Sequence, residues 1–217
     1  MLLPNFHNIP SESTIECLSN HYILQFLNQP AAWMLTPTRR QEKGLGYDAW
    51  LSNTKVVVIQ YKRVKYIYTN GDILIKINHS QHSDLQRNFR SSHKPHAFYA
   101  FSDYSDYQDI NHDYLTSGSP RFFDHTIFFD IHSLSKSDTS VQLCRTGVLR
   151  AKQSKNYYSQ PITYWKGPDF VDQIAKCNLG RFSSAASELT DELVEDVENG
   201  KVRINFLFWK LRNQNIV

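Results

Sequence analysis

The chain has 217 residues, of which 41% are hydrophobic and 21% charged, and its formal net charge is +3. This length and composition are typical of a single globular domain, and no run approaches the roughly 18 apolar residues of a membrane-spanning helix. The first ten residues do not resemble a signal peptide. Three cysteines without CxxC spacing indicate reduced thiols in a cytoplasmic protein, not a zinc site: Cys17, Cys144 and Cys177.

The first part of the chain predicts one helix followed by three strands. Ser11 is the expected N-cap, and apolar residues at three- and four-residue spacing continue the helix to about Asn28. Short strands are expected at 31–35 and 48–51, and a longer strand at 55–64 whose valine-rich start is typical of burial on both faces.

The rest of the chain has weaker patterns. We expect strands at 72–77, 97–101, 125–131, 162–165 and 202–211, and helices at 83–89, 107–115, 170–177 and 184–198. We expect one domain over residues 1–217, with its core at 10–102. Residues 103–217 would then form a sheet extension and C-terminal helices.

The chemistry is concentrated in Asp48 and the triplet Gln60-Tyr61-Lys62, on two strands expected to form a hairpin. Side chains alternate along a strand, so Gln60 and Lys62 point to one face and Tyr61 to the other. Asp48 can lie beside them at the same end of the hairpin. A carboxylate binds Mg²⁺ through oxygen, the ion lowers the pKa of bound water, and a lysine stabilises developing negative charge. The pattern therefore indicates phosphodiester hydrolysis.

These residues carry a family resemblance. The segments Gly46-Tyr47-Asp48 and Gln60-Tyr61-Lys62-Arg63 resemble the restriction-endonuclease-like, PD-(D/E)XK, nuclease superfamily, and more closely its Mrr-like branch with a Gln-x-Lys strand. The resemblance covers residues 10–66. It implies an α/β (α+β) fold with a central mixed sheet flanked by helices, here with a C-terminal elaboration. It also implies that Asp48 binds the metal, Gln60 occupies the second acidic position and Lys62 is catalytic.

The superfamily commonly supplies a further carboxylate from the helix before the first strand. A helical wheel places Glu12 near the middle of the apolar arc and Glu16 nearer its edge. We therefore expect Glu12 to be a metal ligand, with Glu16 in reserve. Glu42 is a third option, although an ion pair with a neighbouring Arg or Lys explains it more simply. Gln60 departs from the usual Asp or Glu, and a neutral ligand binds a metal more weakly.

The leading hypothesis is an endonuclease dependent on Mg²⁺ or Mn²⁺ that acts on DNA rather than RNA, in restriction, mobile-element defence or repair. Its catalytic residues would be Glu12, Asp48, Gln60 and Lys62, and a homodimer is expected because cutting both strands takes two active sites. One alternative is an inactive nucleic-acid-binding or assembly module with the same fold. The other is a small-molecule or protein-binding domain.

Four weaker patterns have ordinary structural explanations. The pair His79 and His82 lacks a ligand partner at metal-binding spacing. The basic stretch 87–96 suits either a phosphate backbone or solvent. Arg121 and His125 belong to a turn, residues 121–125, whose polar residues cap a core strand, although either could contact a substrate. The acidic helix expected at 184–198 is typical of a solvated face, although it could dock a partner or shield a basic groove.

Overall fold

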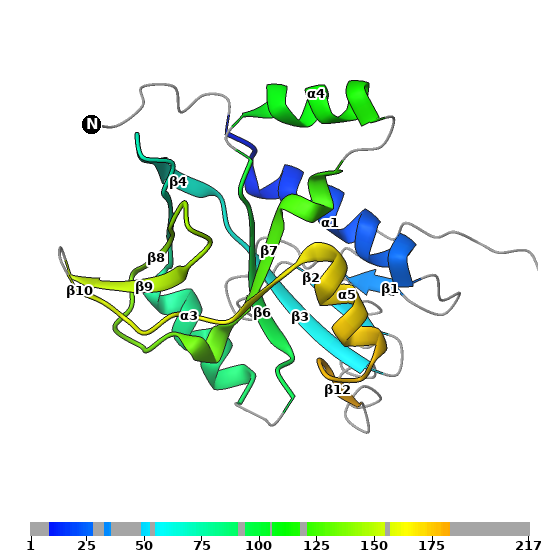
Figure 1. Cartoon of the computed structure of the whole chain (residues 1–217). Coiled ribbons are helices and arrows are strands. Elements are labelled where there is room, and N and C mark those ends of the chain that lie inside the picture. Colours follow the sequence, from blue (N-terminus) through cyan, green and yellow to red (C-terminus); the bar gives the residue numbers. More distant parts are fainter. Residues whose placement is uncertain are drawn as a thin grey trace, which may run out of the picture.

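The computed structural model describes residues 9–27, 33–35, 49–52, 55–90, 94–104, 106–117, 121–154 and 157–182. In this part of the chain, helices lie on both faces of a mixed sheet, and a second sheet packs beside it (Figure 1). The mixed α/β class predicted from the sequence is confirmed. None of the described helices is long and apolar enough to cross a bilayer.

The main sheet has seven strands among the described residues, in the order β1-β2-β3-β6-β7-β11, with β12 also paired to β3. They are β1 (Trp33–Leu35), β2 (Ala49–Ser52), β3 (Lys55–Tyr61), β6 (Ala97–Ser102), β7 (Thr126–Asp130), β11 (Tyr164–Lys166) and β12 (Arg181–Phe182). Strands β3 and β6 are parallel, and the other neighbours are antiparallel. The predicted order of one helix and three strands is confirmed by α1 (Glu12–Leu27) and β1 to β3.

The second sheet has the order β10-β9-β8-β5-β4. Its strands are β4 (Val64–Ile67), β5 (Ile73–Lys76), β8 (Ser140–Leu143), β9 (Leu149–Ser154) and β10 (Tyr157–Tyr158). The sequence predicted β5 alone among them. It merged the start of β4 with β3 in one strand at 55–64, whereas the chain leaves β3 after Tyr61 and enters the other sheet at Val64. Strands β8, β9 and β10 were missed because they are short and carry few apolar residues.

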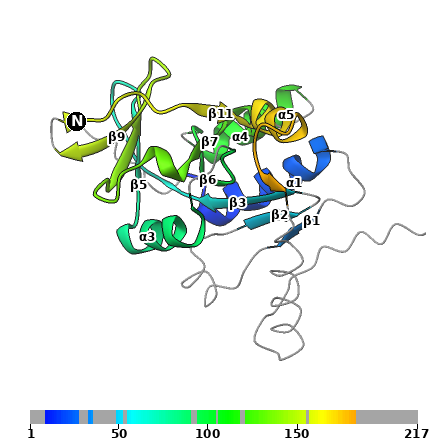
Figure 2. The same ribbon diagram turned by 90° about the horizontal axis from the view of Figure 1, so that it is seen from below.

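Two hydrophobic clusters lie on opposite faces of the main sheet. One joins Val58 and Tyr99 to the second sheet and to α3 (His79–Asn88). The other packs against α1, the 3₁₀ helix η2 (Arg121–His125) and α5 (Gly167–Ala175). Figure 2 shows the second sheet to one side of the main sheet, near α3. Even-numbered residues of β3 therefore face α3, and odd-numbered residues face α1.

Several element boundaries differ from those expected. Helix α3 begins at His79, four residues before the predicted start, because Asn78 caps it. Helix α5 begins at Gly167, with Pro168 in its first turn, where the fixed φ angle of proline suits a helix. Helix α4 (Tyr107–Ser117) confirms the prediction, and a 3₁₀ turn, η3 (Ile131–Ser133), follows β7. The elements expected at 184–198 and 202–211 lie outside the described residues.

Candidate functional site

Gln60 and Lys62 lie at the end of β3, on the face that α3 covers. Gln60 is fully buried, and Lys62 is 7% exposed. The side chain of Gln81 joins them, since its Oε1 accepts a hydrogen bond from Lys62 Nζ at 2.6 Å and its Nε2 donates to Gln60 Oε1 at 2.7 Å. Lysine can only donate, so Gln81 must turn its oxygen to Lys62 and its nitrogen to Gln60. The three side chains form one hydrogen-bonded chain of fixed direction.

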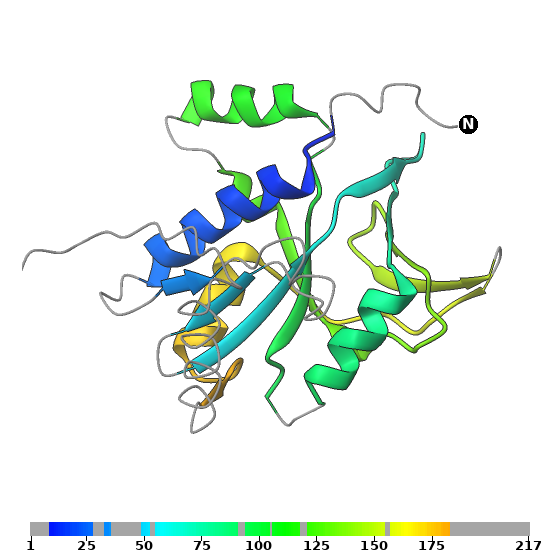
Figure 3. The same cartoon turned by 180° about the vertical axis from the view of Figure 1, so that it is seen from behind.

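The residue between them points to the opposite face of the sheet, as the sequence predicted. Tyr61 is fully buried in the α1-side cluster, and its hydroxyl donates to Asn20 Oδ1 of α1 at 2.7 Å. The end of β3 is therefore held from both sides, by α1 through Tyr61 and by α3 through Gln81. Figure 3 shows β3 passing between these two helices and continuing into β4.

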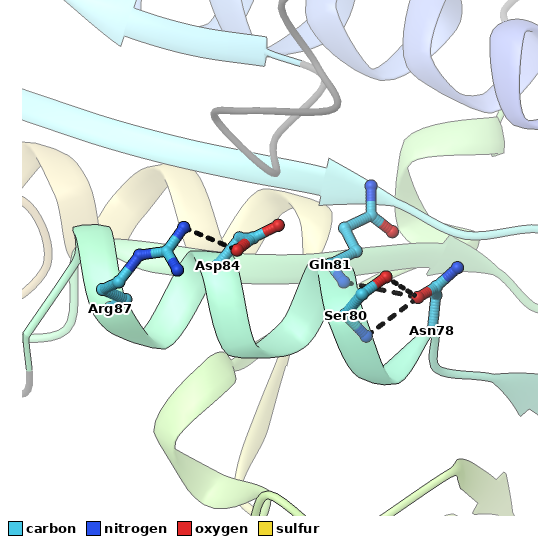
Figure 4. Close-up of polar contacts among 5 residues, drawn as sticks. All are labelled: Asn78, Ser80, Gln81, Asp84 and Arg87. Carbon is cyan, nitrogen blue, oxygen red and sulfur yellow. Dashed lines mark hydrogen bonds and ion pairs between the residues drawn. The ribbon is translucent and has the colours of Figure 1, made fainter.

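The start of α3 positions Gln81. Asn78 Oδ1 accepts from the backbone N–H of Ser80 at 3.0 Å and of Gln81 at 3.3 Å. A glutamine three residues after the cap often reaches back to the capping residue. In Figure 4 the Gln81 side chain instead extends towards β3, away from Asn78. Gln81 was not singled out from the sequence, because the spacing of Asn78 and Gln81 predicts only a helix start and not a contact with β3.

Lys62 has no ion-pair partner among the described residues. The ion pairs found among the described residues join Arg87 to Asp84, His125 to Asp103 and Lys176 to Asp172. None of them involves Lys62, whose described partner is the neutral amide of Gln81. Burying a charge without a partner of opposite charge costs on the order of several kcal/mol. A negatively charged group from outside the described residues, or from a ligand, would therefore stabilise Lys62.

Glu12 is exposed, so the expectation that it lies on the buried face of its helix is wrong. The buried stripe of α1 consists of Ile15, Ser19 and Ile23, and Glu12 extends this stripe by one turn. It is the first residue of α1. There its Oε1 accepts from the backbone N–H of Arg63 at 3.1 Å, beside Lys62. Glu16 is half-buried.

Asp48 and Glu42 lie outside the described residues. Strand β2 begins at Ala49, which pairs with Ile59. Within the described ranges, no group of three or more His, Cys, Asp or Glu side chains is arranged to hold a metal ion. Glu12 offers one carboxylate, and the amide oxygen of Gln60 already accepts from Gln81. These donors do not form a magnesium site by themselves, and a further carboxylate is needed.

The two histidines of the HxxH pattern do not converge. His79 is exposed, whereas His82 is fully buried, with its Nδ1 3.1 Å from the Tyr99 hydroxyl. Burial lowers the pKa of His82 below its ordinary value. His79 is thus a surface histidine and His82 a core histidine.

A second polar cluster lies at the same end of the main sheet as Lys62. Asp103 follows β6, which is parallel to β3, and His125 directly precedes β7. His125 Nδ1 lies 2.7 Å from Asp103 Oδ1, and its ring centroid lies 4.4 Å from that of Tyr104. These residues line a shallow open pocket with Asp109 and Asp113. The sequence singled out His125 but missed Asp103, because their pairing depends on the β6–β7 contact.

We expect the Asp103–His125 pair to stabilise the fold less as the pH rises. The hydrogen bond to Asp103 raises the pKa of His125 above the ordinary 6.5. Its stabilisation is therefore complete below pH 6.5 and is lost as the pH rises through the raised pKa. The imidazole is 39% exposed, so solvent screening limits the effect to about 1 kcal/mol or less.

Urea unfolding of the wild type and of His125→Gln, between about pH 5.5 and about pH 8.5, measures this effect. The difference in unfolding free energy between the two proteins should shrink towards alkaline pH. A difference that is constant over this range would contradict the expectation.

Comparison with known proteins found no match to this chain among protein-family models, curated proteins or solved structures. A function must therefore be argued from the residues at the end of β3 and from the elements that position them.

Proposed function

We propose that the protein is a metal-dependent nuclease that hydrolyses phosphodiester bonds, in DNA rather than RNA. The observation that carries the proposal is the buried Lys62, which Gln81 holds at 2.6 Å at the end of a central strand. The order of α1 and β1 to β3, with α1 and α3 on opposite faces of a mixed sheet, also fits the restriction-endonuclease-like core.

In this proposal the carboxylates of Asp48 and Glu12 hold Mg²⁺ or Mn²⁺, both of which prefer oxygen ligands. Such an ion polarises a phosphate and lowers the pKa of its bound water. The proposal requires Asp48, which directly precedes the Ala49–Ile59 pair, to lie beside Gln60. Gln60 would complete the metal site only if its Oε1 gave up the hydrogen bond from Gln81 and bound the ion instead. Lys62 stabilises the negative charge that develops on the phosphate.

A second candidate function is the binding of nucleic acid without cleavage. One observation favours it: Gln60 is fully buried and its Oε1 is already engaged by Gln81. Binding by such a module would not depend on a divalent metal.

Cleavage assays separate the two functions. Plasmid DNA, single-stranded DNA and RNA are incubated with the protein in Mg²⁺, in Mn²⁺ and in EDTA. The nuclease proposal expects cleavage that needs a metal and is lost in Asp48→Asn, a variant with the same shape but no carboxylate charge. Cleavage that survives Asp48→Asn would overturn the assignment, and binding without cleavage in every metal would favour the second function.

We further propose that the protein is a cytoplasmic homodimer. Its biological role would be in restriction, mobile-element defence or repair. Cutting both strands of a duplex requires two active sites, and a symmetric pair supplies them. All three cysteines are free thiols, which suits a reducing compartment. Light scattering of the purified protein tests the dimer, which a monomer at assay concentration would exclude.

Gln81 has an expected role as a positioning residue for Lys62. Its replacement by methionine keeps the length of the side chain but removes both hydrogen bonds. We expect kcat to fall by about 10- to 100-fold, as for other groups that orient a catalytic side chain, with KM little changed. The matched control is Gln86→Met on the same helix, where Gln86 donates instead to the Leu134 carbonyl at 3.0 Å. Equal losses of activity in the two variants would rule out this role.

A further inference from the structure

The outer face of the second sheet differs in composition from its inner face. The inner side chains belong to the core cluster shared with the main sheet, and they include Ile73, Ile75, Val141, Leu143, Leu149 and Ala151. The residues that alternate with them point outwards. The strand register arranges these in two rows, Tyr66-Leu74-Gln142-Arg150 and Lys76-Ser140-Lys152-Tyr158. Apart from Leu74, this outer face is polar, aromatic and basic, and Leu74 and Gln142 in its first row are buried.

The five strands themselves carry charge of one sign, although the Asp72 carboxylate is hydrogen-bonded to Gln142 in the middle of the outer face. The five strands contain four basic residues and no acidic residue. The basic residues are Lys65, Lys76, Arg150 and Lys152. The whole chain has a net charge of only +3, so positive charge is concentrated on this sheet. The aspartates of the pocket at α4, Asp103, Asp109 and Asp113, belong to other elements.

The basic side chains are arranged around tyrosines. Lys65 and Lys76 are exposed, and Lys65 Nζ lies 5.4 Å from the centre of the Tyr66 ring. Lys152 Nζ lies 5.9 Å from the centre of the Tyr158 ring. The strand geometry separates Arg150 from Lys152 by about 7 Å and Lys76 from Lys152 by about 10 Å. Several cations are therefore spread over a surface wide enough for more than one phosphate.

Hydrogen bonds hold the middle of this face in place. The Tyr158 hydroxyl donates to Gln142 Oε1 at 2.9 Å, and Gln142 Nε2 donates to Asp72 Oδ2 at 2.7 Å. The other oxygen of Asp72 accepts from the backbone N–H of Arg145 at 2.9 Å. The carboxylate nearest the sheet is thus engaged by these donors and does not form a described ion pair with its lysines.

The second sheet is continuous with the candidate site. Strand β4 begins at Val64, two residues after Lys62, and Figure 3 shows β3 running into it. The sheet and α3 share one hydrophobic cluster, on the face of the main sheet where Gln60 and Lys62 meet Gln81. The outer face of the sheet points away from this shared cluster.

We propose that the outer face of the second sheet binds the phosphate backbone of nucleic acid. This proposal does not depend on the proposed nuclease function. Phosphate contacts hold a strand in place without reading its sequence, and their strength falls with salt. Binding through this face is therefore independent of sequence and strongly dependent on salt.

The test measures the fluorescence anisotropy of a labelled oligonucleotide, as a single strand and as a duplex, in EDTA over a range of salt concentrations. The test variant is Lys76→Gln with Lys152→Gln, and the control is Lys166→Gln with Lys176→Gln, two exposed lysines of β11 and the end of α5. The test variant should bind about tenfold more weakly, with the salt slope reduced by about 2. The control should bind like the wild type, and thermal melting checks that both variants are folded.

The outcomes distinguish this inference from the proposed function. Equal weakening in the two variants, or unchanged binding in the test variant, overturns the inference even if metal-dependent cleavage is found. Weakening specific to Lys76 and Lys152 without cleavage in any metal supports the binding face and contradicts the nuclease. Whichever form binds through these lysines, single strand or duplex, is identified as the ligand.

Discussion

Replacing Lys62 by methionine is expected to remove most of the nuclease activity without destabilising the fold. Methionine matches the length of the lysine stem but cannot stabilise the charge on a phosphate. Loss of one such group lowers kcat by about 10²- to 10³-fold in other enzymes. The variant should be at least as stable as the wild type, and its free energy of unfolding could be higher by about 1 kcal/mol. The reason is that an apolar group replaces a buried charge without a described counter-ion.

The measurements are cleavage of plasmid DNA in Mg²⁺ and unfolding in urea. The control is Lys176→Met, an exposed lysine that pairs with Asp172 four residues earlier in α5, and it should leave both quantities nearly unchanged. Full activity in Lys62→Met would disprove a catalytic role for this lysine. A loss of activity that only parallels a loss of stability would assign Lys62 a structural role.

Replacing Gly167 by alanine is expected to destabilise the protein by about 3 kcal/mol, the upper part of the range for overpacking a core. The added Cβ would lie 2.2 Å from the Phe123 carbonyl oxygen and 2.6 Å from Cγ of the Phe123 ring. Phe123 is 2% exposed, and its ring stacks against Tyr22 and Phe26 of α1. Neither the carbonyl nor the ring can move aside without disturbing the contact between α1 and α5.

Chemical denaturation of Gly167→Ala beside Gly147→Ala separates packing from backbone strain. Gly147 has a φ angle of +80°, and a Cβ there would meet only the Tyr164 hydroxyl at 3.5 Å. Its replacement should cost about 1–2 kcal/mol, the penalty for an L-residue in the left-handed region. If Gly167→Ala costs no more than Gly147→Ala, the close contact with Phe123 is not a determinant of stability.

The arrangement of Gln60, Tyr61 and Lys62 was predictable because alternation along a strand is a local property. Two residues of spacing place Gln60 and Lys62 on one face in any extended strand, and the structure agrees. The position of Glu12 was predictable only in part. The helical period correctly extended the buried stripe towards Glu12, but it contains no information about where the sheet ends.

Gln81 and Asp103 could not be predicted as partners of Lys62 and His125. Gln81 is 21 residues from Gln60, and Asp103 is 22 residues from His125. Each pair forms only when separate elements pack together, α3 on β3 in one case and β6 on β7 in the other. No periodic pattern in the chain marks such a pairing.

By itself, the sequence determined the helix that follows Ser11, the buried strand β3 and the faces to which its polar side chains point. These features follow from capping and from short-range periodicity, which act within a few residues. Tertiary structure alone decided that the chain leaves β3 after Tyr61 for a second sheet, and that Lys62 is buried against Gln81. The physical reason is that the path of the chain after Tyr61 and the burial of Lys62 both depend on apolar surfaces from distant parts of the sequence. These surfaces come together only in the packed fold, where they are removed from water.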